Sequence, residues 1–163
     1  MEYLDIVNEH DVIIGRANKM EVYEKKLRHR IAHILVFNKK GELALQMRGQ
    51  GVHFAPGHWS TTAAGHVSSG ESYEQAAIRE SQEEIGVTFP IKHLAIDHYL
   101  DQSRQVPKIL GTFTALFEGP FYPDPDPVVE VRYFSLEVIK KMIAAGEPFH
   151  PELLFLLKRH YGF

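Results

Sequence analysis

Three carboxylates lie close together in one stretch of the chain, where Glu80, Glu83 and Glu84 follow directly on Arg79. Residues three and four apart share a helix face, so in a helix these side chains lie next to one another. Each like-charge pair at that spacing costs roughly 0.2–0.5 kcal/mol, and Arg79 offsets only one of the charges. Acidic side chains near a helix C-terminus also meet the negative end of the helix macrodipole. The cluster therefore destabilises the helix that carries it.

Two interpretations explain such a cluster. The first is a solvated acidic face, although a surface helix usually interleaves lysines and residues 73–85 contain none. The second is a site for a hard cation. Mg²⁺ and Mn²⁺ prefer carboxylate oxygens and retain several waters, which leaves positions for phosphate oxygens. Helix geometry alone leaves both interpretations open.

The spacing of the whole segment 65–87, GHVSSGESYEQAAIRESQEEIGV, favours the cation site. It reads glycine, five residues, glutamate, seven residues, arginine–glutamate, two residues, two glutamates, one residue, glycine and an aliphatic residue. This pattern resembles the Nudix box, the signature of hydrolases that act on nucleoside diphosphates linked to another group. Ser81 stands where that family has an aliphatic residue, a position that affects helix packing and supplies no metal ligand.

The resemblance implies an α/β fold, an α/β/α sandwich built on a mixed sheet, with Mg²⁺ or Mn²⁺ as cofactor. The implied metal ligands are the carbonyl of Gly65 and the carboxylates of Glu80, Glu83 and Glu84. Arg79 would orient a glutamate by ion pairing, and Glu71 would tie the loop to the helix. Glu80 or Glu84 would act as general base. Because the base varies within the family, Glu118 and Glu130 are further candidates, although structural roles are favoured for both.

A closer resemblance extends over roughly residues 3–135. The segments LRHRIAHILVFNKKGELALQMRG and AAGHVSSGES are similar to those of bacterial hydrolases related to isopentenyl-diphosphate isomerase. In that isomerase two histidines help to bind a metal, and the matching positions are His29 and His66, which makes a second metal site an alternative. The catalytic cysteine of the isomerase falls at Ala64, and this chain has no cysteine. That departure favours hydrolysis over isomerisation.

Three functions are therefore compared. The favoured one is hydrolysis of a phosphoanhydride bond in a nucleoside diphosphate derivative (a nucleoside di- or triphosphate, a nucleotide sugar or a dinucleotide) by a metal-activated water. The alternatives are an isopentenyl-diphosphate isomerase-like enzyme and a non-catalytic module that reads a nucleotide. A binding module would be free to lose the glutamates of the box, yet all four are present.

Substrate-binding residues are harder to identify from sequence. Arg48 follows a predicted strand, and an arginine fork suits phosphate oxygens, although a surface salt bridge is an equal alternative. Phe121 and Tyr122 lie in the proline-rich loop GPFYPDPDP and are candidates to stack on a base. Trp59 is instead expected in the core. His33, within an apolar strand, is expected to be buried and hydrogen-bonded.

The elements that must position these residues follow from periodicity, caps and turns. Ser72 with Gln75 forms a capping box and Gly86 suits a C-cap, which predicts a helix over 73–85. Asn18 is expected to cap a short helix to about residue 25, and Ser135 caps another that ends at Gly146. Strands are predicted at 3–7, 12–14, 31–38, 43–47, 59–64, 91–100, 109–117 and 128–134, and a last helix at 151–160. One domain spanning 1–163 accounts for all of them.

Composition narrows the partners. The 163 residues carry a net charge of −3, which gives no electrostatic case for binding nucleic acid or an anionic membrane surface. The absence of cysteine excludes a disulfide framework and a thiolate zinc site, and fits a cytoplasmic location. No signal peptide or membrane span is recognised. The expected partner is a small phosphorylated molecule. A homodimer stays open, since Phe155 and Leu156 of the last helix suit either the core or an interface.

Overall fold

One mixed sheet organises the chain in the computed structural model, which describes residues 1–163. The sheet has seven strands, five of them in the order β5-β4-β3-β8-β7, with β6 also paired to β3 and β9 to β4. Their bounds are β3 (His29–Phe37), β4 (Leu43–Arg48), β5 (Trp59–Ser60), β6 (Ala63–His66), β7 (Lys92–Asp101), β8 (Val106–Leu116) and β9 (Val128–Phe134). Only β3 and β8 run parallel. Because β3 is covered on both faces, it reads as an almost continuous apolar run.

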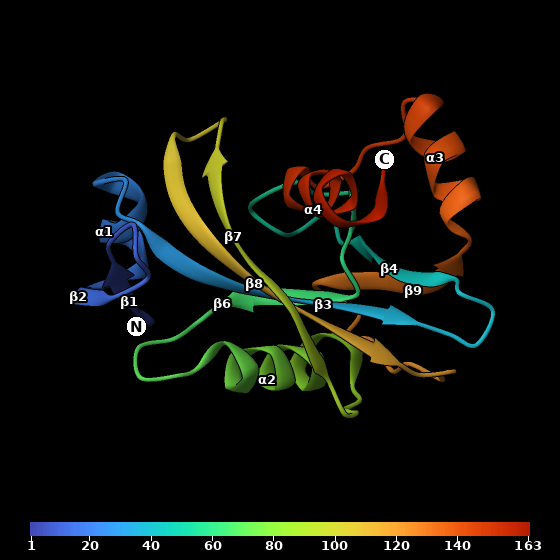
Figure 1. The fold of residues 1–163 in the computed structure, drawn as a ribbon, viewed down its shortest axis with the longest axis horizontal. Coiled ribbons are helices and arrows are strands. Elements are labelled where there is room, and N and C mark those ends of the chain that lie inside the picture. The colour runs from blue at the N-terminus through green and yellow to red at the C-terminus, as the bar shows by residue number, and fades with distance from the viewer.

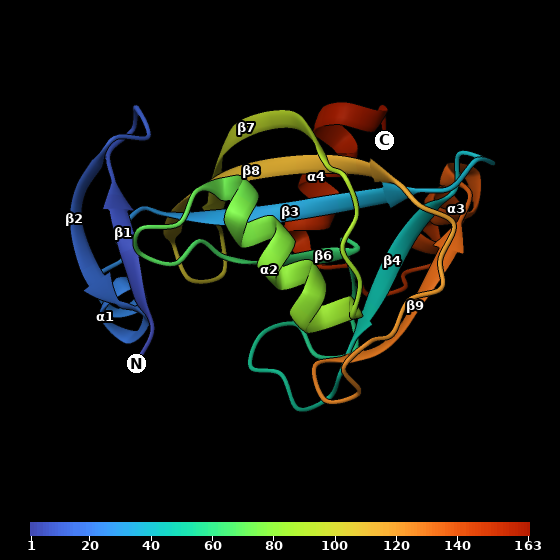
Figure 2. The same cartoon turned by 90° about the horizontal axis from the view of Figure 1, so that it is seen from below.

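Helices cover both faces of the sheet, which confirms the predicted α/β sandwich (Figure 1). Helix α2 (Tyr73–Ile85) crosses one face, and α4 (Pro151–Tyr161) lies on the other with α3 (Leu136–Ala144) beside it (Figure 2). The α2 face packs Ala76 and Ala77 against aliphatic residues of β3. The α4 face packs leucines of α4 against β4 and Trp59, so the core position predicted for Trp59 is confirmed.

The sheet opens between β4 and β6. Strand β3 pairs with β4 only at Val36 and Phe37, beyond which β4 diverges from β3 while it stays paired with β9 along its whole length. Strand β6 takes the vacated place beside β3. The predicted single strand over 59–64 is therefore wrong, because β5 pairs with β4 while β6 pairs with β3. Between them Thr62 crosses the gap: its hydroxyl donates to the Ala44 carbonyl and accepts from the Val36 N–H.

Helix α2 begins and ends where the sequence predicts. Ser72 and Gln75 form the reciprocal capping box, and Gly86 ends the helix in the left-handed conformation with φ of 70°. Ser81, the departure from the box pattern, is buried, and its hydroxyl donates to the Val87 carbonyl at 2.7 Å. That bond satisfies the hydroxyl within the protein, which explains why a polar residue is tolerated there.

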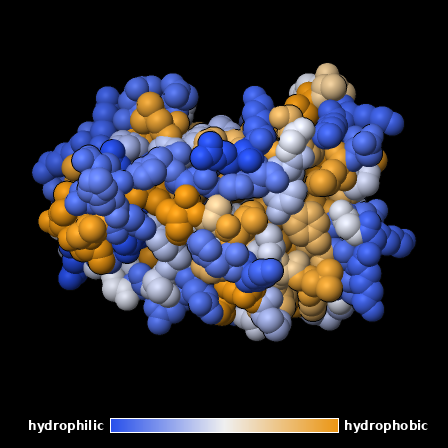
Figure 3. All heavy atoms as spheres, in the orientation of Figure 1, coloured by the Kyte–Doolittle hydropathy of each residue, from blue (hydrophilic) through white to orange (hydrophobic).

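The first residues form a separate lobe beside the sheet. Strands β1 (Tyr3–Val7) and β2 (Ile13–Asn18) pair as an antiparallel hairpin, and Asn18 caps α1 (Lys19–Glu24) as predicted. Ile14 and Met20 lie exposed on this lobe, and Figure 3 shows the apolar patch at its left edge.

The last helix packs within this chain. Leu156 is fully buried and Phe155 lies against Tyr99, so both residues contribute to the protein's own core. No helix has the length and apolar character needed to cross a membrane.

The N-terminus of α4 depends on an uncharged histidine. Pro151 occupies the first turn, and His150 is the N-cap, its Nδ1 accepting from the Glu152 N–H at 3.1 Å. Burial lowers the pKa of His150 to about 4, although Glu152 opposes the shift. Protonation would remove the lone pair that caps the helix. The cap is therefore made only by the neutral form.

His150→Asn is expected to flatten the acid dependence of stability. Because the pKa of His150 is about 4 when folded and 6.5 when free, the unfolded chain binds more protons between these values. Stability is thus complete above pH 6.5 and falls as the pH drops toward 4, by up to about 3 kcal/mol. Asparagine keeps the cap without titrating. Urea unfolding at several pH values measures the slope, and equal slopes for both proteins would contradict this assignment.

Candidate active site

Two glutamates of α2 reach the opening in the sheet. The Glu84 Oε1 accepts from the Ala64 N–H of β6 at 2.9 Å and from the Gln46 Nε2 of β4 at 3.1 Å. Glu84 thereby joins the two strands that do not pair with each other. Glu80, one turn earlier, lies against Gly65, where a methyl group would overlap its carboxylate. Only glycine leaves this position free for the carboxylate.

Arg79 holds the loop and the helix together. Its Nε and Nη2 donate to the Glu71 carboxylate at 2.7 and 2.9 Å, and Nη2 also donates to the His66 carbonyl. Its Nη1 donates to Glu80 at 2.7 Å and reaches Glu83 at 3.3 Å. Glu71 in turn accepts from the Ser68 N–H. These contacts are the ones expected of Arg79 and Glu71: the arginine orients Glu80, and the loop is tied to the helix.

The electrostatics of this pair favour a cation. Burial, with a further contribution from the nearby Glu80 charge, raises the pKa of Glu84 to about 8. Burial likewise raises the pKa of Glu80 to about 7 against the opposing effect of Arg79. Each carboxylate is therefore costly to ionise here unless a positive charge compensates it. Glu83 is more than half exposed at the edge of the cluster.

The chemistry of these donors suits a hard divalent ion. Carboxylate oxygens and a peptide carbonyl are the ligands that Mg²⁺ and Mn²⁺ prefer, and the backbone of Gly65 lies beside Glu80. No three His, Asp or Glu side chains converge as a ready-made metal site. The fit therefore rests on the donor type and on the cost of ionising both Glu80 and Glu84, since Arg79 pairs with only one of them.

The histidine pair behaves differently from the glutamates. His29 and His66 stack with ring centroids 5.5 Å apart, but no carboxylate joins them. The His66 Nε2 is hydrogen-bonded to the Tyr23 hydroxyl at 2.7 Å, and the His29 Nδ1 donates to the Leu27 carbonyl. Burial lowers the pKa of both rings, and the nearby Lys108 ammonium lowers them further. A second metal site at this pair stays a prediction; the His29 Nε2 has no hydrogen-bond partner within the protein.

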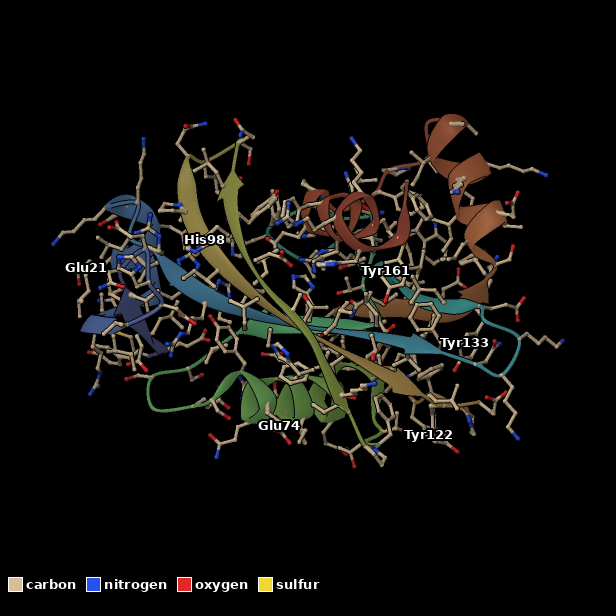
Figure 4. All side chains as sticks on the ribbon, viewed as in Figure 1. Glu21, Glu74, His98, Tyr122, Tyr133 and Tyr161 are labelled. Atoms are coloured by element: carbon tan, nitrogen blue, oxygen red, sulfur yellow. The ribbon has the colours of Figure 1, made fainter.

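The two aromatic residues predicted to bind substrate, Phe121 and Tyr122, lie near the C-terminal end of α2. Phe121 packs against Phe117 and Tyr133 in the core. The Tyr122 N–H donates to the Ile85 carbonyl, and its ring is exposed beyond the C-terminal end of α2 (Figure 4). The proline-rich loop therefore covers the C-terminal end of the helix, and the Phe121 ring is partly buried against its aromatic neighbours. The sequence shows the loop's composition but not which segment it packs against.

The two candidate bases outside the box are both engaged at other places. Glu118 accepts from the Lys39 N–H, and Glu130 pairs with Arg132 at 3.0 Å. Structural roles are thus the simpler account of both.

Arg48 does lie at the site. Its Nε donates to the Phe54 carbonyl at 3.0 Å, and burial lowers its pKa against the opposing charges of Glu84 and Glu152. Gln46, which contacts Glu84 directly, escaped the sequence analysis because a lone glutamine in a strand carries no chemical signal. The one hint in the sequence is that Gln46 lies in a predicted strand, two residues before Arg48.

His33 is buried as predicted. It joins a charged network on the α4 face of the sheet, contacting Thr61 and Glu152 at 2.9 Å each. Lys108 donates to the other oxygen of Glu152 at 3.0 Å. The sequence signals neither Lys108 nor Glu152, since one is a lysine in a strand and the other an acid in a helix's first turn.

Comparisons with known proteins agree with this geometry. A model of the NUDIX domain matches residues 27–157. The uncharacterized Nudix hydrolase YfcD of Salmonella typhi is 32% identical over 94% of this chain and 81% of its own. Isopentenyl-diphosphate Delta-isomerase 2 of Photorhabdus laumondii is 38% identical over 87% and 82%. A crystal structure from Deinococcus radiodurans superposes with a TM-score of 0.84 at 25% identity, covering 98% of this chain and 99% of that one.

Proposed function

Because this chain belongs to the Nudix family, we propose that it is a divalent-metal-dependent hydrolase that cleaves a phosphoanhydride bond in a nucleoside diphosphate derivative. The observation that carries the proposal is the pair of Glu80 and Glu84 at the opening of the sheet, where burial raises the pKa of both carboxyl groups and Arg79 forms an ion pair with only one of the two, Glu80. A cytoplasmic location and a small phosphorylated partner belong to the same proposal.

The carboxylates of Glu80, Glu83 and Glu84 with the Gly65 carbonyl would hold Mg²⁺ or Mn²⁺. When bound, such an ion neutralises phosphate charge and makes water more acidic. Arg79 holds Glu80 in place, while Gln46 and the Ala64 N–H hold Glu84. A water oxygen attacks phosphorus, the bridging P–O bond breaks, and the water's proton passes to Glu80 or Glu84. Arg48 contributes positive charge for the phosphate oxygens.

Isomerisation is the second candidate, favoured by the 38% identity to the Photorhabdus laumondii isomerase. Against it, Ala64 stands where that enzyme class has its cysteine, and the chain has no thiol to replace it. A non-catalytic nucleotide-binding module is the third.

A cleavage screen separates these functions. Nucleoside di- and triphosphates, nucleotide sugars, dinucleotides and isopentenyl diphosphate are incubated with the protein in Mg²⁺, Mn²⁺ or EDTA. Release of a phosphorylated product that EDTA stops supports the hydrolase and identifies its substrate. Conversion of isopentenyl diphosphate without hydrolysis supports the isomerase. Nucleotide binding with no turnover of any compound supports the binding module and contradicts our proposal.

Gly65→Ala is expected to lower kcat/KM by roughly 10–100-fold with little loss of stability. The added methyl group would displace the Glu80 carboxylate, a flexible chain end, and misplacing such a group by about 1 Å can cost that much. Steady-state kinetics and thermal unfolding measure the two effects. Gly15→Ala is the matched control, because a methyl group there meets only Ile6 at an ordinary 3.9 Å. Equal activity of the two variants would show that Gly65 is not needed for the position of Glu80.

A further inference from the structure

Arg104 is held in an unusually fixed position for an arginine in a turn. It lies between β7 and β8, where its Nε donates to the buried Asp101 carboxylate at 2.7 Å. Its guanidinium lies over the rings of Tyr23 and Phe54, 4.4 and 4.3 Å from their centroids. The two aromatic residues come from α1 and from the loop between β4 and β5. Three segments distant in sequence thus meet at one guanidinium.

Both aromatic residues connect Arg104 to the candidate active site. The Tyr23 hydroxyl is hydrogen-bonded to His66, the residue that follows Gly65. The Phe54 carbonyl accepts from Arg48, which lies close enough to Glu84 for their charges to interact. Tyr23 therefore links Arg104 to the Glu80 side of the carboxylate pair, and Phe54 links it to the Glu84 side. Figure 1 shows the β7–β8 turn, which carries Arg104, on the opposite side of the sheet from α2.

The free groups of Arg104 suit an anion. Only its Nε is used by Asp101, and neither Nη atom has a hydrogen-bond partner in the protein. The side chain is 36% exposed, so these donors are accessible. A planar guanidinium already held by two rings and a carboxylate loses little conformational entropy when it binds a phosphate through two parallel bonds.

We propose that Arg104 binds a phosphate of the substrate, with Tyr23, Phe54 and Asp101 as the residues that position it. The inference rests on the proposed function, because it takes the substrate to be a phosphorylated molecule that lies across the box. It adds a second arginine to Arg48 and extends the binding surface to the β7–β8 turn. Phe54 would then position both arginines, Arg48 through its carbonyl and Arg104 through its ring.

Binding and kinetics test this role with defined probes. ADP and inorganic pyrophosphate supply phosphate, and adenosine supplies the same nucleoside without it. Arg104→Gln is expected to weaken binding of ADP and pyrophosphate by about tenfold or more, because it removes the charge-assisted bonds to phosphate, and to leave adenosine binding unchanged. For the substrate found by the screen, KM rises about tenfold while kcat stays within twofold. Arg104→Lys, which keeps the charge but loses the planar fork, recovers part of the loss.

Arg132 provides the matched control. It too pairs with a glutamate and lies over two rings, those of Trp59 and Phe134, but it has no contact with the box. If Arg104→Gln affects ADP binding no more than Arg132→Gln does, or if wild type binds neither ADP nor pyrophosphate at millimolar concentration, the proposal is wrong. Failure of the hydrolase proposal gives a different result: no compound is turned over, but the ADP-binding measurement still shows whether Arg104 binds phosphate.

Discussion

Glu84→Gln is expected to lower kcat for metal-dependent hydrolysis by about 10²–10⁴-fold, the range for loss of a group that moves a proton or stabilises the transition state. Glutamine keeps the shape of the side chain, and its oxygen can still accept from the Ala64 N–H and the Gln46 amide. It removes only a charge that burial disfavours. The free energy of unfolding is therefore not expected to fall, so the loss of rate cannot be attributed to unfolding.

The control for this variant comes from the same helix. Glu74 lies in the first turn of α2, exposed and directed away from the sheet (Figure 4). Glu74→Gln removes the same charge and is expected to leave kcat within twofold. Steady-state assays of both variants in Mg²⁺ and Mn²⁺ measure the difference. Equal rates for Glu84→Gln and wild type would remove Glu84 from the mechanism and with it the observation on which the proposed function rests.

Lys108→Met is expected to destabilise the protein by about 3–5 kcal/mol, since it leaves a buried carboxylate without its cation. Glu152 and Lys108 are both nearly inaccessible, with 4% and 3% exposure. Burial raises the pKa of Glu152, but Lys108 and His33 outweigh it and hold the pKa well below its ordinary value. Burial lowers the pKa of Lys108, and Glu152 raises it overall. Both groups are therefore charged at neutral pH, and each needs the other.

Urea unfolding measures this loss against a surface pair. Lys25 forms a 2.7 Å ion pair with Glu21 on α1, and Lys25→Met is expected to leave the free energy of unfolding nearly unchanged because that pair is exposed. The double variant Lys108→Met/Glu152→Gln is expected to recover part of the stability, since no unpaired charge stays buried. A loss for Lys108→Met no greater than for Lys25→Met would contradict the charged network.

The helix that carries the box could be predicted almost residue by residue. Its boundaries depend on Ser72, Gln75 and Gly86, which act through backbone groups within four residues of themselves. The link between Arg79 and Glu83 is likewise one helical turn long. Local interactions of this kind depend only on residues that are close together in the sequence. The carboxylates and their type of chemistry could therefore be predicted without a structure.

The surroundings of that helix were decided by tertiary structure. Whether Glu84 meets Gln46, whether Phe121 is packed or free, and whether Lys108 lies near His29 depend on where β4 leaves β3 and β6 replaces it. That divergence is set by pairing between strands far apart in sequence, and no single residue predicts it. The sequence by itself determined the reactive groups and the helix that presents them. Only the folded sheet decided which residues surround them, because burial and charge pairing are properties of contacts that cross the chain.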